Sequence, residues 1–286
     1  MKAIILKINA NQIVVWYKNE KYEVFAPGKW KKNLILRPGD KVELILKNNE
    51  YQINTFFKRK NCLDKPKVAN IDNIVIVQSY VMPNINWNQL LKTLFFYEYH
   101  LNIKPIVVIT KTDIVNLNSS DQHYLDDLKK QDYLIFVKNN ENDFNNFLLK
   151  LSNKITSFVG QSGVGKSTLI NDINPNFLRL TNEISKKLKR GKNTTTQTEL
   201  LPFNGGFLVD TPGYSKFSNN LDERQLSIAS NLFKILKLKC KFQDCLHINE
   251  LNCAIKNAVN NSLIPKWQYD IYVHLQKQLK KNNFLN

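Results

Sequence analysis

The stretch ITSFVGQSGVGKST, residues 155–168, decides the fold because it joins an apolar strand to a glycine-rich loop. The loop fits the pattern G-x-x-x-x-G-K-[ST], and the following LINDI has helical spacing. Gly160 and Gly165 let the backbone curl until successive N–H groups face phosphate oxygens, and the helix N-terminus adds partial positive charge. A chance glycine-rich turn is disfavoured by the flanking strand and helix. The sequence therefore predicts a phosphate-binding loop made of Gly160, Gln161, Ser162, Gly163, Val164, Gly165, Lys166, Ser167 and Thr168.

Within this loop, two side chains are expected to act directly on a nucleotide. Lys166 should bridge the β- and γ-phosphates, and the Ser167 hydroxyl should bind Mg²⁺.

Two segments after the loop are expected to respond to the γ-phosphate. DTPG, residues 210–213, ends the apolar strand GFLV. Asp210 is therefore predicted to act on Mg²⁺ through a water, and the Gly213 amide to meet the γ-phosphate. GKNTTTQ, residues 191–197, lies between the two motifs and should supply a threonine ligand to Mg²⁺. We assign Thr195, with Thr194 and Thr196 as alternatives; a solvated linker would have the same composition.

A candidate base-reading segment, VITKTD at residues 108–113, lies upstream of the phosphate loop. The Asp113 carboxylate can accept from both N1–H and N2–H₂ of guanine, a pair that adenine does not offer. Lys111 can lie along the base, and Thr110 stands where Asn is usual, so it can make fewer hydrogen bonds. The competing interpretation is an ordinary turn, but the segment ends a strand, where ligands bind in open α/β sheets. The predicted base-side residues are Thr110, Lys111, Thr112 and Asp113, with a further loop at residues 138–140.

The order along the chain is base reader, phosphate loop, threonine loop and DTPG, whereas an ordinary GTPase has the phosphate loop first. We interpret this order as a circular permutation, because folding requires the same packed strands and not the same chain ends. DTPG then leads directly into the C-terminal region, so the nucleotide state can be coupled to the position of that region.

Strands and helices alternate around these motifs, which predicts a doubly wound α/β domain. Strands are expected over 73–79, 105–110, 133–138 and 155–160, helices over 87–101, 123–130, 144–151 and 165–173, and a hairpin over 198–210 that turns at Asn204-Gly205.

The chain is predicted to have three domains. Residues 1–66 contain five short alternating segments between turn signals, which favour a small β-barrel of the OB-fold type. Residues 67–218 form the permuted GTPase-type domain, and residues 219–286 form a helical domain interrupted by a Cys/His cluster. In the barrel, Trp16, Tyr22, Phe25 and Tyr51 are expected in the core.

Four potential metal ligands lie within fourteen residues: Cys240, Cys245, His247 and Cys253. Three thiolates and one imidazole make a closed tetrahedral set, which suits structural Zn²⁺ and leaves no open position for catalysis. Three reduced core cysteines beside a histidine are the alternative. Cys62 is expected to be a free thiol.

The net charge of +17 suits a polyanionic partner, although a coding bias toward Lys, Asn and Ile would produce the same charge. Two basic segments are candidate RNA contacts. APGKWKKN, residues 26–33, mixes one aromatic ring with lysines, but it is equally well a solvated turn with the indole folded back. KKLKRGKN, residues 186–193, lies beside the threonine loop. The candidate RNA-binding residues are Lys29, Trp30, Lys31, Lys32, Lys189 and Arg190.

Apolar runs stay well short of the ~20 residues that a membrane span needs, and the N-terminus reads as strands. We therefore expect a cytoplasmic monomer with no membrane partner.

Taken together, the motifs resemble the ribosome small-subunit-dependent GTPase A (RsgA) family. KVANIDNIVIVQS, VITKTD, GQSGVGKSTLIN, GKNTTT, DTPG and CKFQDCLH follow the family's order over almost the whole chain. The resemblance implies hydrolysis of GTP to GDP and phosphate with Mg²⁺, stimulated by the small ribosomal subunit and its rRNA, in late subunit maturation. It also implies zinc at the four Cys and His residues.

Three positions depart from patterns found in the family or in other GTPases. Asn193 stands where the family usually has a histidine proposed to be catalytic, and Tyr214 follows DTPG where many GTPases hold a water-orienting glutamine. Gly163 replaces the asparagine through which some permuted relatives bind potassium, so that mode is not expected. The resemblance thus leaves two alternatives: a GTPase that serves another RNA or membrane partner, and a GTP-gated RNA- or ribosome-binding module with incidental hydrolysis.

Overall fold

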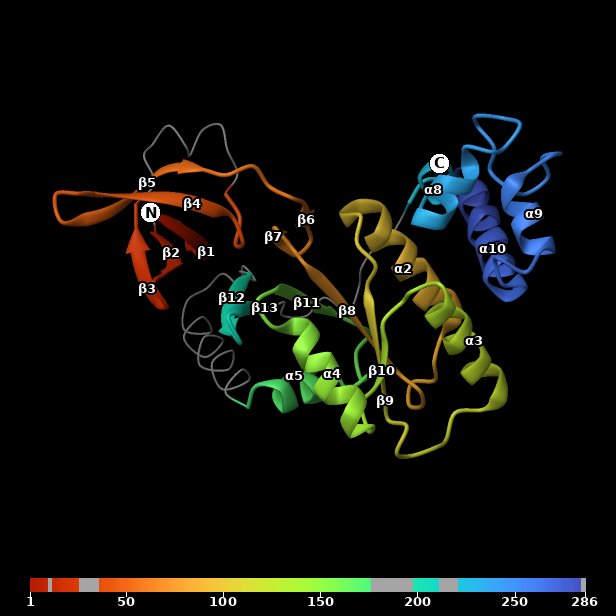
Figure 1. Ribbon diagram of the computed structural model, residues 1–286, viewed down its shortest axis with the longest axis horizontal. Helices are drawn as coiled ribbons and strands as arrows, with labels where there is room; N and C mark the ends of the chain where they lie inside the picture. Colours follow the sequence, from red (N-terminus) through yellow and green to blue (C-terminus); the bar gives the residue numbers. More distant parts are fainter. Residues whose placement is uncertain (10–11, 26–35, 176–197, 211–220, 284–286) are drawn as a thin grey trace.

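The computed structural model describes residues 1–9, 12–25, 36–175, 198–210 and 221–283. A β-barrel, a central α/β domain and a C-terminal group of helices follow one another along the chain (Figure 1). Among the helices it describes, none combines the length and apolar character needed to cross a membrane.

Five strands form the N-terminal sheet, in the order β3-β2-β1-β4-β5. A parallel bridge between Phe25 and Gln52, with Ile53 N donating to Phe25 O at 3.2 Å, closes the end of β3 onto β5. The five strands therefore close into a small barrel, whose strand number is the one expected for the predicted OB-fold. The strands are β1 Lys2–Asn9, β2 Gln12–Tyr17, β3 Glu20–Val24, β4 Lys41–Lys47 and β5 Glu50–Phe56.

Side-chain alternation along these strands fills the barrel with apolar residues. Tyr17, Tyr22 and Tyr51 are partly buried against this core and pack edge to face or tilted, with ring centroids 5.1–5.9 Å apart. Two of the expected core aromatics lie elsewhere. Phe25 is 58% exposed because it sits at the closing edge, and Trp16 lies edge-on to Phe207 of the central domain at 6.2 Å.

The central sheet has six strands in the order β10-β9-β8-β11-β13-β12. All neighbouring pairs are parallel except β12 with β13, which form the expected hairpin with positive φ at Asn204 and Gly205. The ends of β9 and β11 therefore meet at one edge, which places both predicted nucleotide loops together. The strands are β8 Asn73–Ser79, β9 Ile106–Thr110, β10 Ile135–Val137, β11 Ile155–Val159, β12 Glu199–Phe203 and β13 Gly206–Asp210.

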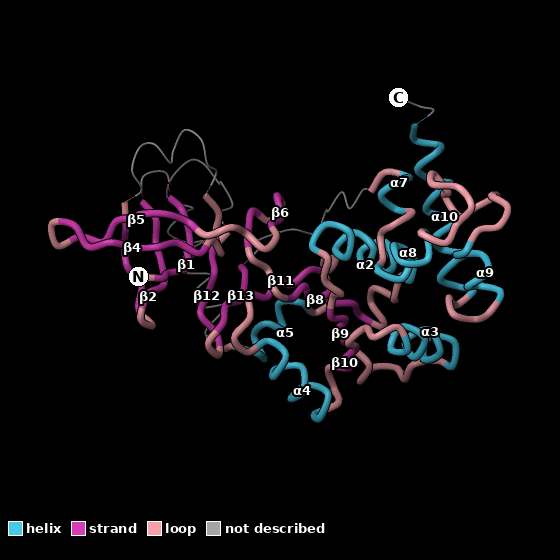
Figure 2. Tube along the Cα trace, turned by 45° about the horizontal axis from the view of Figure 1, so that its top comes forward, coloured by secondary structure: helices cyan, strands magenta, loops and turns pink. Residues whose placement is uncertain are grey.

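Helices cover both faces of this sheet, as the continuous apolar strands predict. In β8, Ile74 and Ile76 belong to the buried cluster with α2 (Trp87–Leu101) and α3 (Ser119–Lys130). Val75 and Val77 belong to the cluster with α4 (Glu141–Leu151) and α5 (Lys166–Ile173). Figure 2 shows α4 and α5 on one side of the strands, and α2 with the C-terminal helices on the other.

A short hairpin links the barrel to the central domain. β6 (Cys62–Asp64) and β7 (Lys67–Ala69) pair across the position where the sequence places the boundary between residues 66 and 67.

The C-terminal helices pack on α2 and α3 through aromatic contacts. Trp267 stacks on Tyr124 with ring centroids 4.3 Å apart, and its Nε1 donates to Asp127 Oδ2 at 3.0 Å. Phe95 of α2 contacts Phe233 at 5.8 Å. Helix α10 is thus a packing element of this region. The helices are α7 Glu223–Leu226, α8 Asn231–Lys237, α9 Ala254–Asn260 and α10 Lys266–Asn283.

Candidate nucleotide site and metal centre

The phosphate loop joins β11 to α5 with the backbone that its glycines require. Gly163 and Gly165 have φ of 82° and 84°, and Gly165 is the N-cap of α5. A Cβ on Gly160 would lie 2.5 Å from Val77 O, so this position admits no side chain without a backbone shift. Lys166 and Ser167 open α5, where backbone N–H groups without intrahelical partners can bind phosphate.

The base-reader segment lies directly on the phosphate loop. Thr110 Oγ1 donates to Val164 O at 2.6 Å, and Lys111 Nζ donates to Gly163 O at 2.8 Å. Thr110 is 2% exposed and Val164 is fully buried, so the first bond is shielded from water. Two segments 54 residues apart in the chain therefore form one site, which is the arrangement that a permuted nucleotide pocket requires.

Lys111 has a second acceptor, the carbonyl of Met82, in the loop that follows β8. The sequence gives no signal for this contact, because every residue carries a backbone carbonyl and the identity of residue 82 therefore does not matter. Lys111 itself adopts φ of 60°, in the left-handed region.

Asp113 lies at the surface beside the loop after β10. A hydrogen bond from the Asn139 side chain, with its own backbone N–H and the charge of Lys138, lowers the pKa of the Asp113 carboxyl. The carboxylate is therefore ionised at neutral pH, which suits an acceptor of hydrogen bonds from a base. The loop at residues 138–140 is thus adjacent to Asp113 through Asn139, and its contact with a base stays a prediction.

Several predicted site residues lie outside the described residues: Asn193, Thr194, Thr195, Thr196, Gly213 and Tyr214 of the switch segments, and Lys29, Trp30, Lys31, Lys32, Lys189 and Arg190 of the candidate RNA contacts. Asp210 is placed by its backbone as the last residue of β13. Their roles stay predictions.

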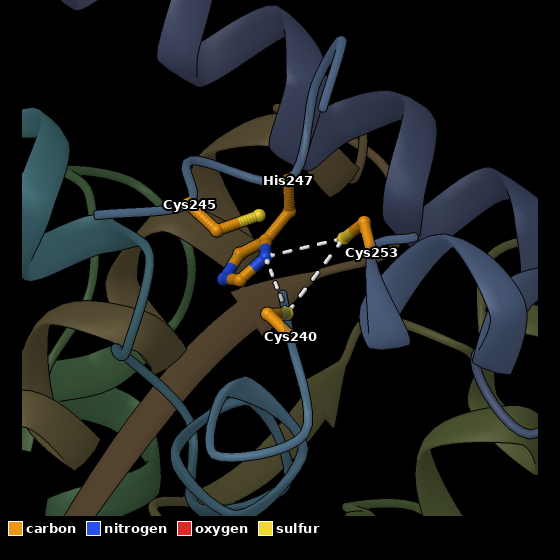
Figure 3. Close-up of side chains that lie close together, drawn as sticks. All are labelled: Cys240, Cys245, His247 and Cys253. Carbon is orange, nitrogen blue, oxygen red and sulfur yellow. Dashed lines mark hydrogen bonds between the residues drawn. The ribbon is translucent and has the colours of Figure 1, made fainter. Parts of the chain in front are cut away.

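The four predicted metal ligands converge on one point, with all four ligand atoms within 4.8 Å of one another (Figure 3). His247 Nδ1 lies 3.4 Å from Cys253 Sγ and 3.7 Å from Cys240 Sγ, and the two sulfurs are 4.0 Å apart. Tetrahedral Zn²⁺ with Zn–S of about 2.3 Å and Zn–N of about 2.0 Å places its ligand atoms about 3.5–3.8 Å apart. The separations among Cys240, His247 and Cys253 are close to these values, and Cys245 Sγ lies within 4.8 Å of the others, so the four side chains can hold zinc.

The chemistry of these donors also suits a cation. Burial raises the pKa of the Cys245 thiol to about 12 and also raises the pKa of Cys253, so these thiols ionise only with a compensating charge. Burial lowers the pKa of His247 to about 4, which keeps its imidazole neutral. The opposite ring nitrogen, Nε2, lies 3.0 Å from Ser227 O and so carries the proton. This outer contact orients the ring for metal binding.

The fold and the nucleotide site define a P-loop GTPase whose base reader precedes its phosphate loop, that is, a circularly permuted GTPase. A family model described as RsgA GTPase matches residues 56–220. The chain belongs to the RsgA GTPase family and is a GTP-hydrolysing enzyme.

Curated relatives and solved structures match over nearly the full length. The chain is 41% identical to the small ribosomal subunit biogenesis GTPase RsgA of Mycoplasmoides gallisepticum over 98% of this chain and 100% of that protein. It is 40% identical to the protein of the same name from Ureaplasma urealyticum, over 98% of this chain and 95% of that protein. Its structure is similar to that of YloQ, a circularly permuted GTPase, with a TM-score of 0.78 and 27% identity. The match covers 98% of this chain and 95% of YloQ. The structure of YjeQ from Thermotoga maritima also gives a TM-score of 0.78, with 29% identity, over 97% of this chain and 98% of that chain.

Proposed function

We propose that this protein binds GTP between the phosphate loop and residues 110–113, and hydrolyses it to GDP and phosphate on the small ribosomal subunit during late maturation. The observation that carries the proposal is the bond between Thr110 and Val164, which joins the two halves of the pocket. The curated relatives are named for small-subunit biogenesis, and this chain spans nearly all of their length.

Each predicted site residue then has a role. The loop amides and Lys166 hold the phosphates, while Ser167, Thr195 and Asp210 (through a water) surround the Mg²⁺ that accompanies GTP. Gly213 meets the γ-phosphate, and Asp113 selects guanine.

The zinc-binding residues have a structural role, because four protein ligands leave no open position. Cys240, Cys245, His247 and Cys253 would hold the ion, which fixes the loops between α8 and α9.

We further propose that the chain acts as a monomer in the cytoplasm, through three units at residues 1–66, 67–218 and 219–286. One chain supplies the base reader, the phosphate loop and the metal ligands, and reduced thiols suit the cytoplasm. The chain has 41 basic and 24 acidic residues, and this positive charge favours binding to a polyanion such as RNA. We assign the RNA contact to Lys29, Trp30, Lys31, Lys32, Lys189 and Arg190.

Stimulation of hydrolysis by the subunit distinguishes this function from a second candidate, because the chain has no evident group that activates the attacking water. Asn193 is no general base, and Tyr214 replaces the usual water-orienting glutamine. Slow intrinsic turnover follows, with the subunit ordering the switch segments or positioning the water. The second candidate, a GTP-gated ribosome-binding module with incidental hydrolysis, shares the slow turnover but lacks the stimulation.

Phosphate release with and without purified small subunits tests the choice. We expect stimulation of about tenfold or more, since groups supplied in trans can raise GTPase rates far beyond that. GTP-dependent binding to subunits with unstimulated turnover supports the second candidate instead. Asn193→His, measured in parallel, is expected to raise the unstimulated rate.

A further inference from the structure

Glu199, which begins β12, forms a charged contact between the central sheet and the barrel. Its Oε2 lies 3.6 Å from Lys7 Nζ of β1, and its Oε1 lies 3.7 Å from Lys21 Nζ of β3. The side chain of Glu199 is 9% exposed, whereas those of Lys7 and Lys21 are 28% and 49% exposed. A largely buried carboxylate of the GTPase domain is therefore held between two ammonium groups of the barrel.

The position of Glu199 in the sheet links it to the nucleotide site. In the antiparallel pairing of β12 with β13, its Cα partner is Asp210, the predicted Mg²⁺-side acid. These two residues form the open end of the hairpin, opposite the turn at Asn204-Gly205. Along the chain, the threonine loop enters β12 at this end and the DTPG segment leaves β13 there. Both predicted switch segments are thus attached to the hairpin beside Glu199.

Apolar contacts hold the same hairpin to the barrel. Leu6 and Val14 of the barrel share a buried cluster with Leu200 of β12 and Phe207 of β13, and Trp16 packs edge-on against Phe207. Apolar packing is non-directional, whereas two charge pairs on one carboxylate also fix where it sits. The barrel and the hairpin should therefore move together.

We propose that Glu199 is a positioning residue that couples the barrel to Asp210, so that binding of RNA to the barrel adjusts the magnesium side of the GTP site. This inference rests on the proposed function for its ribosomal partner. Glu199 acts through the β12–β13 hairpin and does not touch the nucleotide. Coupling is reciprocal for binding, so the nucleotide state also alters the barrel.

The first test uses the isolated protein and is independent of ribosomes. Hydrogen exchange of the barrel strands is compared between the GDP form and a form with a non-hydrolysable GTP analogue. We expect a nucleotide-dependent change at residues 2–9 and 20–24 in the wild type, and its loss in Glu199→Gln, which keeps the shape but removes the charge. Absence of any such change in the wild type overturns the inference.

The second test measures subunit-stimulated hydrolysis. We expect Glu199→Gln to keep the affinity for GTP within about twofold and to lose at least about fivefold of the stimulation, the lower end of usual coupling. Glu50→Gln, at an exposed glutamate of β5, is the matched control for net charge. The reversed pairs, Glu199→Lys with Lys7→Glu and Lys21→Glu, should restore both the stimulation and the nucleotide-dependent exchange of the barrel. A merely structural role would not produce that nucleotide dependence.

The two proposals fail in different ways. A wild type that the subunit does not stimulate contradicts the proposed function, while the exchange experiment still decides the coupling. A stimulated wild type together with an equally stimulated Glu199→Gln overturns the coupling alone.

Discussion

The Thr110 hydroxyl joins the two halves of the nucleotide site. It donates to Val164 O at 2.6 Å, so it ties the base-reader loop to the phosphate loop. Lys111 adds a second tie to the same loop at Gly163 O. Two neighbouring side chains therefore connect the two loops.

Replacing Thr110 by Val should loosen that connection. The Val164 carbonyl is buried, and an unpaired buried acceptor costs about 1–3 kcal/mol. We expect the free energy of unfolding to fall by about 1–2 kcal/mol and the affinity for GTP to fall with it. Urea denaturation and nucleotide titration measure the two effects. Thr110→Ser keeps the hydroxyl and is the control; equal losses in both variants would rule out the hydrogen bond as the cause.

Asp113 tests the base assignment. Its lowered pKa keeps the carboxylate charged, and hydrogen bonds to a charged acceptor are stronger than those between neutral groups. We expect Asp113→Asn to weaken GTP binding by about tenfold or more. ATP binding should change little. Titration of wild type and variant with both nucleotides measures this, and a preference for GTP that survives the substitution contradicts the assignment.

At the scale of elements, the local signals predicted regular segments well and their starts less well. Helix α2 occupies 87–101, as its apolar spacing predicts. Helices α3 and α4 begin at Ser119 and Glu141, earlier than the expected 123 and 144, because their first turns are polar. Asn118 and Asn140 cap them by accepting from backbone N–H groups, a signal that apolar periodicity does not detect.

Helix α7 depends on its neighbours more than on its own sequence. It has four residues, too few for an isolated helix. His247 Nε2 donates to Ser227 O just beyond its end, and Gln276 Nε2 of α10 donates to Glu223 O at 2.9 Å. The metal site and α10 thus hold the first described helix after DTPG.

Removal of zinc by a chelator should therefore release α7. Without the ion, the imidazole loses its fixed orientation, and with it the bond to Ser227. We expect faster hydrogen exchange at residues 223–228 and unchanged exchange in β8, the internal control. Equal exchange in α7 before and after chelation would show that zinc does not support it.

At the scale of the whole molecule, Glu98 joins the central domain to the C-terminal region. It is 1% exposed, accepts from Tyr133 Oη, and accepts from Asn231 N at the start of α8 at 3.2 Å. Burial raises the pKa of the Glu98 carboxyl above its ordinary 4.5, although the Tyr133 and Asn231 bonds oppose the shift. The folded state therefore favours the protonated acid.

The sign of the resulting pH dependence follows from linkage. A raised pKa gives stability that is present below the ordinary value near 4.5 and is lost as pH rises through the folded value. We expect the free energy of unfolding of the wild type, relative to Glu98→Gln, to decrease as pH rises from 4 to 7. Urea denaturation at several pH values measures this difference. A difference that is constant with pH would show that the pKa of Glu98 is the same in the folded and unfolded states.

The sequence by itself determined what depends on neighbours along the chain. The phosphate loop, the Asn204-Gly205 hairpin, the alternation of strands and helices and the spacing of the metal ligands all rest on conformational preferences within about twenty residues. The permuted order of the motifs was also readable directly, because each motif is local.

Only the tertiary structure decided which distant groups meet. Thr110 contacts a residue 54 positions away, and Glu98 contacts one 133 positions away. Glu199 meets Lys7 and Lys21 because the hairpin packs on the barrel, and no periodicity in the sequence encodes that docking. Such pairs depend on how completed elements pack, so residue type gives the chemistry of each group but not its partner.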